Sequence, residues 1–162
     1  MEYKTMETDP NDGNQTQQKE EVAPAQSSYT IIAYPSSKLP LQYQNVIFSR
    51  WLRALKFGND YFKLIDSDAY YSGYHKCIEL LLAQPSSVVR LAVLSDDQDV
   101  VLGWSVVRGD TLDFVHVHKD NRNLGIGSAL VPANITTITH LTKAGMAIWN
   151  KKLPNVAFNP FK

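Results

Sequence analysis

Residues 115–130 read VHVHKDNRNLGIGSAL, and this segment is the most informative part of the sequence. Its alternating valines predict the end of a β-strand, and residues Ile126 to Val131 predict a short helix. Between them stand Gly125 and Gly127, which have no Cβ and therefore let the backbone come close to a ligand. Backbone N–H groups at the start of a helix bind anions, and Arg122 adds a cation with forked donors. The stretch therefore predicts a site for a phosphate or pyrophosphate.

Two better-known glycine loops do not fit these residues. A dinucleotide-binding fingerprint needs a third glycine where this chain has Leu130, and an acidic residue about 20 positions later, which is missing. A P-loop needs Gly-Lys-Ser or Gly-Lys-Thr after four spacer residues, and the sequence has neither. A different phosphate-binding loop is therefore expected.

The segments before the loop predict the larger part of a sheet. Three strands, at 88–94, 100–108 and 111–118, are joined by short turn-like connections and predict an antiparallel meander. Before the meander we expect a strand over 30–34 and two helices, over 41–57 and 66–84, the second capped by Asp66.

The segments after the loop complete one domain. We expect a strand over 135–141, where β-branched residues dominate, a helix over 142–152 and a last short strand over 156–158. The whole pattern predicts the α/β (α+β) class, with a mixed, mainly antiparallel sheet flanked by helices.

The overall composition excludes several classes of protein. The 162 residues suit one domain, and 16 basic against 16 acidic side chains argue against a general nucleic-acid or membrane-surface binder. No apolar run approaches the ~20 residues that span a bilayer. A single cysteine, Cys77, excludes an internal disulfide, fits a cytoplasmic protein and is expected to be a small buried hydrophobic residue. The cysteine and the scattered histidines lack metal-ligand spacing, so we expect no metal site.

The charge is divided unevenly along the chain. Residues 1–28 hold six acidic and two basic side chains and almost no large apolar ones, which predicts a disordered acidic tail. A tail that folds on a partner is the alternative. Residues 29–162 hold 14 basic and 10 acidic side chains, so the predicted domain is mildly basic and suited to an anionic ligand.

The loop resembles the signature of the GNAT superfamily of N-acetyltransferases. That signature is Arg/Gln-x-x-Gly-x-Gly/Ala, and this chain has RNLGIG at 122–127, approached by VHKDN at 117–121 with the family's spacing. The sequence VLGW at 101–104 is similar to the family's middle strand, and the order of elements is similar over about residues 29–160. The resemblance implies the GNAT acyl-CoA N-acyltransferase fold for residues 29–162. It also implies a shortened C-terminal end, because the final hairpin is missing or reduced to one strand.

The resemblance also implies a chemistry. Backbone groups around Val117 and Lys119 would pair with the pantetheine arm of acetyl-CoA, and the Ser128 hydroxyl would add a donor to its phosphates. The backbone N–H groups that would hold the pyrophosphate belong to Arg122, Asn123, Leu124, Gly125, Ile126 and Gly127. The strands on either side of the loop would splay apart to admit the thioester. A primary amine of a protein or small molecule would then attack it directly.

Two histidines are candidates for the base that this attack requires. His116 lies on the strand before the loop, on the same side as Phe114 and His118, and a histidine pKa can lie near neutrality. His140 lies on the predicted strand after the loop helix and would line the opposite wall of the opening. For each of them a purely structural role is the alternative, and Asp113 is expected to be a turn or surface acid.

The general acid and the biological setting are less well defined by the sequence. Many GNAT enzymes carry a tyrosine in the last helix, where this chain has Trp149 or Asn150, so Tyr70, Tyr71, Tyr74 or water would have to serve. A non-catalytic binding module of the same fold is therefore the rival interpretation. The short ending resembles proteins of tailed bacteriophages, which implies the host cytoplasm, and an edge strand left unpaired would favour a homodimer.

Overall fold

The computed structural model describes residues 28–162, and the predicted acidic tail lies outside the described residues except for Ser28. The elements follow one another in this order: β1 (Tyr29–Pro35), α1 (Leu41–Gly58), α2 (Asp60–Lys63), α3 (Ser67–Leu82), β2 (Ser87–Leu94), β3 (Val101–Arg108), β4 (Thr111–Val117), α4 (Ile126–Leu130), β5 (Thr137–Ile138), α5 (Lys143–Lys152) and β6 (Ala157–Phe158). Single 3-10 turns lie at Ser36–Lys38 and Lys119–Asn121.

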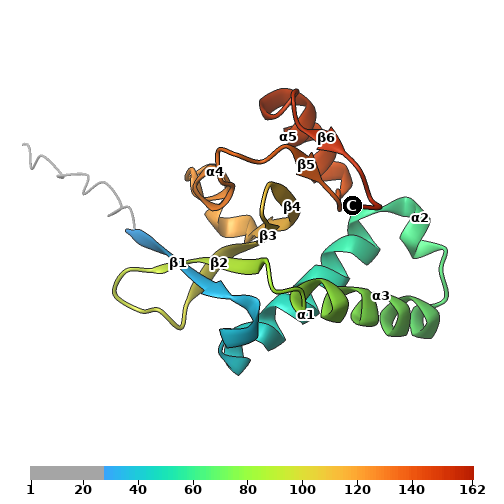
Figure 1. Ribbon diagram of the computed structural model, residues 1–162, viewed down its shortest axis with the longest axis horizontal. Helices are drawn as coiled ribbons and strands as arrows, with labels where there is room; N and C mark the ends of the chain where they lie inside the picture. The colour runs from blue at the N-terminus through green and yellow to red at the C-terminus, as the bar shows by residue number, and fades with distance from the viewer. Residues whose placement is uncertain (1–27) are drawn as a thin grey trace, which may run out of the picture.

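The strands form one sheet in the order of the chain, β1 to β6. Neighbours from β1 to β4 are antiparallel, whereas β5 is parallel to β4 and β6 is parallel to β5. Helices α1 and α3 lie on one side of this sheet, α4 lies on the other, and α5 stands beside β5 and β6 (Figure 1). The predicted mixed, mainly antiparallel sheet flanked by helices is confirmed.

Side chains of successive strand residues pack into different layers. Phe114 of β4 is buried with Trp51 of α1 and Trp104 of β3 in the cluster under α1 and α3. Val115 and Val117 pack instead against the cluster that contains Ile126 and Leu130 of α4. The alternation of this strand therefore fixes α1 and α3 on one face and α4 on the other.

The predicted strand over 135–141 is too long. Only Thr137 and Ile138 pair with neighbouring strands, at Thr111 and Leu112 of β4. The start of β5 is held by the turn before β4, because the N–H groups of Thr136 and Thr137 donate to the carbonyl of Asp110 at 2.8 and 3.3 Å. After Thr139 the chain leaves the sheet. The β-branched residues of 135–141 therefore did not predict the length of β5.

Two of the predicted helices, α3 and α5, begin at a side-chain cap. Asp66 accepts hydrogen bonds from the N–H groups of Asp68 and Ala69 at 3.0 and 3.1 Å, which confirms it as the cap of α3. Thr142 accepts from the N–H of Gly145 at 3.0 Å and caps α5. The prediction for Cys77 is wrong, because this residue lies on the exposed side of α3.

After α5 the described chain adds one strand, β6. Lys162 donates to the Asp110 carboxylate at 2.9 Å, and its own carbonyl accepts from Arg108 at 3.1 Å. Hydrogen bonds from Thr136 and Lys162 lower the pKa of Asp110 to about 2. The last residues are therefore attached to the turn between β3 and β4. Within the described chain β1 and β6 are the sheet edges, and the homodimer stays a prediction.

Gly103 sets the spacing between β3 and β4. A Cβ on this residue would lie 2.8 Å from the carbonyl oxygen of His116 and 3.2 Å from Cδ1 of Leu130. We expect Gly103→Ala to lower the free energy of unfolding by about 1–3 kcal/mol, measured by urea denaturation, because the strands must move apart. Gly73 of α3 is the matched control, since a Cβ there meets nothing within 4 Å. Gly73→Ala should stabilise the protein by about 0.5–1 kcal/mol, and equal effects of both changes would contradict the close approach.

Candidate functional site

Strands β4 and β5 separate after a short contact. Their pairing consists of Thr111 with Thr137 and Leu112 with Ile138, followed by one hydrogen bond from the N–H of Thr139 to the carbonyl of Leu112 at 3.1 Å. Strand β4 continues to Val117, and from Phe114 onward it pairs only with β3 among the described strands. A free strand edge therefore leads from the opening directly into the glycine loop.

The glycine loop presents a row of backbone donors. The N–H of Arg122 donates to Lys119, and the N–H of Ala129 donates to Gly125. Between these two bonds, the N–H groups from Asn123 to Ser128 make no hydrogen bond within residues 28–162. Asn123 and Gly125 have left-handed φ angles of 66° and 78°. Left-handed residues at alternate positions turn successive N–H groups toward one side of the chain. This arrangement makes a concave site for an anion.

The structure constrains the two glycine positions of the loop differently. Gly125 has a φ of 78°, a conformation that strains other residue types. Gly127 has no such angle, and a Cβ on it would lie 3.7 Å from Cγ2 of Val117, an ordinary contact. The fold itself therefore leaves room for a side chain at Gly127. Without one, the backbone at this position adds to the open surface of the anion cradle, the name used here for the backbone from Asn123 to Ser128.

The sequence analysis missed several residues around the loop. Arg50 of α1 places an NH1 group 3.4 Å from Nδ1 of His118, and Arg122 donates from Nε to the carbonyl of Val117 at 3.4 Å. Both arginines are exposed, so the mouth of the opening carries two cations from distant parts of the chain. Arg50 stands on an exposed helix position, and the sequence around it contains no signal for this role.

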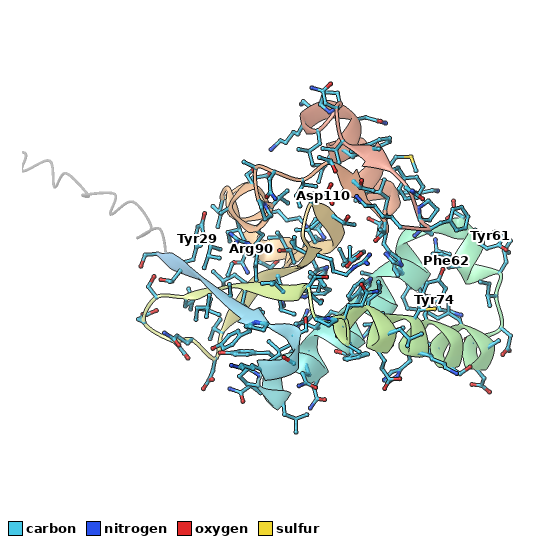
Figure 2. The ribbon with its side chains drawn as sticks, in the orientation of Figure 1. Tyr29, Tyr61, Phe62, Tyr74, Arg90 and Asp110 are labelled. Carbon is cyan, nitrogen blue, oxygen red and sulfur yellow. The ribbon has the colours of Figure 1, made fainter. Side chains whose placement is uncertain are left out.

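Two other side chains, also missed, end helix α4 after five residues. Arg90 of β2 donates to the carbonyls of Leu130 and Ala129 at 3.1 and 3.2 Å, and Ser105 of β3 donates to Leu130 at 2.8 Å. Arg90 and Tyr29 are labelled in Figure 2, on the part of the sheet next to α4. Because these bonds satisfy the last carbonyls, the short helix holds the loop in a fixed position.

His116 lies on β4 as predicted, with its ring stacked on Trp104 at 5.9 Å. Burial lowers the pKa of His116 to about 4, and the charges of His118, Arg50 and Arg122 act in the same direction. The sequence analysis expected a pKa near neutrality. Its imidazole is therefore neutral at pH 7, but a base with so low a pKa takes up a proton weakly.

Asp113 is not a turn or surface acid, as the sequence analysis expected, but a fully buried carboxylate. Arg108 donates to it from Nε at 2.6 Å and from NH2 at 2.7 Å. The register between β3 and β4 shifts at this point, which leaves Asp113 as an extra residue between Leu112 and Phe114. This β-bulge turns its side chain toward Arg108 and Thr139, which strict alternation does not predict.

His140 is joined to this buried pair through Thr139. The Thr139 hydroxyl donates to Oδ1 of Asp113 at 2.9 Å and lies 2.8 Å from Nδ1 of His140. Because the hydroxyl has one proton and gives it to the carboxylate, Nδ1 of His140 must be the donor to Thr139. The lone pair of the neutral imidazole then lies on Nε2, which makes no hydrogen bond with the described residues and is not buried. Burial lowers the pKa of His140, and the Asp113 carboxylate partly opposes this.

A pocket of about 270 Å³ lies at His140, at the C-terminal end of α1. The residues that line it are Leu55, Asn59, Tyr61, Phe62, Tyr74, Thr139, His140, Leu141, Met146, Phe158 and Pro160. Tyr61, Phe62 and Tyr74 lie together between α2 and α3 in Figure 2. A second hollow, lined by residues such as Tyr43 and Asp99, lies at the other end of α1, away from both histidines.

The three candidate tyrosines have different positions. The Tyr70 hydroxyl is buried and donates to the carbonyl of Leu52 at 2.8 Å. Tyr71 packs edge-on against Tyr70, with ring centroids 5.2 Å apart. Of the three, Tyr74 lines the pocket with His140, and burial raises its pKa. Trp149 of α5 donates from Nε1 to the carbonyl of Val156 at 2.7 Å, so its polar atom is used within the C-terminal segment.

Two further findings concern residues 28–162 alone. No group of three or more His, Cys, Asp or Glu side chains is placed to hold a metal ion. No described helix is both long enough and apolar enough to cross a membrane.

Comparison with models of protein families gives no match, and comparison with curated proteins gives none either. Solved structures do match. YycN of Bacillus subtilis, a candidate acetyltransferase, is 11% identical over 75% of this chain and 90% of its own, with a TM-score of 0.55. A predicted acetyltransferase from Clostridium acetobutylicum, solved with acetyl-CoA, is 12% identical over 76% of this chain and 88% of its own, with a TM-score of 0.52. Both similarities show a shared fold.

Proposed function

We propose that this protein, whose fold is that of the GNAT acetyltransferases, transfers an acetyl group from acetyl-CoA to a primary amine. One observation carries the proposal. The free edge of β4 leads directly into a loop whose N–H groups from Asn123 to Ser128 have no partner among the described residues. A strand edge suits the amide groups of a pantetheine arm, and a row of free donors suits a pyrophosphate.

The residues that would bind acetyl-CoA are those of the sequence prediction. In the proposal, backbone groups of Val117 and Lys119 pair with the pantetheine arm. The pyrophosphate lies over the backbone from Arg122 to Gly127, with the hydroxyl of Ser128 as a further donor. Because α4 has five residues, its dipole is small, and we assign most of the affinity to the individual N–H groups and the arginine. Arg50, beside His118, adds a second cation near the same opening.

We assign the role of base to His140 in preference to His116. Nε2 of His140 carries the lone pair and is accessible, whereas burial and two arginines lower the pKa of His116 to about 4. In the reaction, the amine nitrogen attacks the thioester carbonyl carbon, and an N–C bond forms as the C–S bond breaks. The proton of the amine goes to Nε2 of His140. Coenzyme A leaves as a thiolate, which takes a proton from solvent or from Tyr74.

The cradle is tested by substitutions at Gly127. We expect calorimetry to show binding of acetyl-CoA and of coenzyme A with a Kd below about 1 mM, in the range of ordinary enzyme substrates. Gly127→Val should weaken both at least about tenfold, because the three added carbon atoms crowd Val117 and the backbone of the loop. The stability of each variant is measured by urea denaturation, so that a loss of fold is recognised.

Gly127→Ala is the matched control. Its Cβ would make only an ordinary contact with Val117, at 3.7 Å, and the sixth position of the GNAT signature accepts alanine. Its affinity for coenzyme A should therefore stay close to that of the unchanged protein. Absence of binding at millimolar acetyl-CoA in the unchanged protein would overturn the proposed function.

A second candidate is a non-catalytic module of the same fold that binds a partner. It is favoured by the side chains of α5, where Trp149 and Asn150 stand in place of the tyrosine of many GNAT enzymes. A bacteriophage origin and action on a host protein in the host cytoplasm belong to this candidate. Binding of coenzyme A without turnover of any amine, together with a stable protein partner in pull-down experiments, would favour it over the enzyme.

A further inference from the structure

The pocket at His140 has an unusual set of polar atoms. We propose that it binds a small primary amine whose body is a single aromatic ring or a short alkyl chain, with no second charged group. This inference rests on the proposed acetyl transfer and defines the class of acceptor. It is carried by the hydrogen-bonding state of Asn59 and His140, by the apolar lining, and by the pairing of the charges at the rim.

The free polar atoms of Asn59 and His140 are both acceptors. Nδ2 of Asn59 donates to the carbonyls of Leu55 and Leu141 at 3.3 and 3.2 Å, which identifies the other amide atom as the oxygen. That oxygen makes no hydrogen bond with the described residues and is not buried. Nε2 of His140 is the second acceptor, because Thr139 fixes the proton on Nδ1. Both residues line the pocket, and two acceptors in one lining match a ligand group with several N–H donors, such as a primary amine.

The remaining lining suits an apolar body. Tyr61, Phe62, Tyr74, Met146 and Phe158 contribute aromatic rings and a thioether, and the lining contains no carboxylate, lysine or arginine. The sulfur of methionine and the faces of aromatic rings both pack well against an aromatic ligand. Apart from Asn59 and His140, the polar atoms of the lining are few, chiefly the hydroxyls of Tyr61 and Tyr74, so a sugar or a peptide backbone would bury more polar groups than the lining can pair, which costs free energy.

The charges next to the pocket are already paired. Asp60, which follows Asn59, binds Lys63 at 3.1 Å and also binds Lys143 of α5. One carboxylate facing two ammonium groups leaves the rim positive, so it repels a second cationic group on the ligand. A polyamine or an aminoglycoside needs acidic partners for its further amines, but no residue that lines this pocket is acidic, and the neighbouring Asp60 is already bound by two lysines.

The size of the pocket limits the ligand further. Its volume of about 270 Å³ is near the lower end of the range for ligand sites, ~300–1,000 Å³. A single ring with a short aminoalkyl chain fits such a space, whereas a multi-ring sugar amine does not. The proposed ligand is therefore an arylalkylamine or a short alkylamine.

The direct test measures binding of 2-phenylethylamine and of spermidine by calorimetry, each with the free protein and with saturating coenzyme A. We expect 2-phenylethylamine to bind at least about tenfold more tightly than spermidine. With acetyl-CoA, release of coenzyme A should follow the same order. No binding of 2-phenylethylamine in either form, or equal binding of the two amines, would overturn the inference.

A carboxylate placed on the pocket wall should reverse this preference. Met146 lines the pocket and is 47% exposed, so Met146→Glu adds a charge without burying it. The ratio of affinities should shift toward spermidine by at least about tenfold. Ile148→Glu is the matched control, because Ile148 lies on the same helix, is 57% exposed and does not line the pocket. An equal shift in both variants would mean that the surface charge, and not the pocket, selects the amine.

A second variant keeps the test valid if Met146→Glu does not fold. Tyr61 lines the pocket from α2 and is 72% exposed, and Tyr61→Glu should shift the preference in the same direction. The two proposals fail differently. If acetyl-CoA does not bind, the proposed function is wrong, and binding of 2-phenylethylamine to the free protein still tests the pocket. If acetyl-CoA binds and spermidine is the better acceptor, the acetyl transfer stands and the assigned acceptor class is wrong.

Discussion

Replacing His140 with glutamine is expected to lower kcat by about 10²–10⁴-fold, the usual contribution of a positioned general base. The Kd of acetyl-CoA should stay unchanged, because the side chain lies at the amine pocket and not at the glycine loop. In the unchanged protein, kcat should fall as the pH falls through the pKa of His140, since protonation removes the lone pair on Nε2. Burial lowers that pKa, so this limb should lie below the ordinary histidine pKa of about 6.5. The measurement is a pH profile of kcat at saturating acetyl-CoA.

His116→Gln is the control for this assignment. It should leave kcat and the acidic limb nearly unchanged, because a group with a pKa of about 4 takes up a proton weakly and does not titrate across the working range. Thr139 is a positioning residue, and Thr139→Val should cost about 2–10-fold in kcat by releasing the tautomer of His140. Thr139→Ser keeps the hydroxyl and should restore both rate and pH profile. A large loss in His116→Gln together with a small one in His140→Gln would reverse the assignment.

Replacing Asp113 with alanine is expected to lower the free energy of unfolding by about 3–5 kcal/mol. The carboxylate is fully buried and bonds to Arg108 at 2.6 and 2.7 Å. Without it, the guanidinium of Arg108 stays largely buried with no opposite charge, and the Thr139 hydroxyl loses its acceptor. The cost therefore comes from the groups left behind and not only from the lost attraction. Urea denaturation followed by circular dichroism measures it.

Two further variants separate this mechanism from a general loss of charge. Asp96 is exposed on the β2–β3 connection, and Asp96→Ala should change stability by no more than about 0.5 kcal/mol. Replacing Arg108 with methionine and Asp113 with leucine together should recover part of the loss, since no unpaired charge then remains. If Asp113→Ala costs no more than Asp96→Ala, the buried pair contributes nothing to stability.

The sequence was sufficient for features that depend on neighbouring residues. The short turn between β3 and β4, the cap at Asp66 and the short helix after Gly125 all follow from local backbone preferences, and the structure has each of them. The antiparallel order of strands β2 to β4 was also predictable, because short connections leave antiparallel neighbours as the simple solution. Local preferences therefore predicted this meander and the loop, whereas the pairing of β1 with β2 across three helices was not predicted.

The amine pocket could not be predicted, because its parts meet only in the folded protein. Asn59 follows α1, yet its amide binds the carbonyl of Leu141, 82 positions along the chain. Asp113 was misjudged because a β-bulge changes which way its side chain points, and one extra residue leaves little trace in a hydrophobic pattern. The link from Arg108 to His140 passes through Thr139, whose sequence context predicts only a strand.

The shortness of β5 and β6 has a consequence for how a ligand reaches His140. Strand β1 pairs with β2 from Tyr29 to Pro35, whereas β5 is held to each neighbour by two residue pairs. Segments with so few ladder bonds open at a lower free energy than the rest of a sheet. Local opening of β5 and β6 would widen the pocket at His140, while β1 to β4 keep the glycine loop in place. In the proposed reaction, exchange of amine for acetylated product then needs no separate lid, because residues of the weakly paired β5–β6 region also line the pocket at His140.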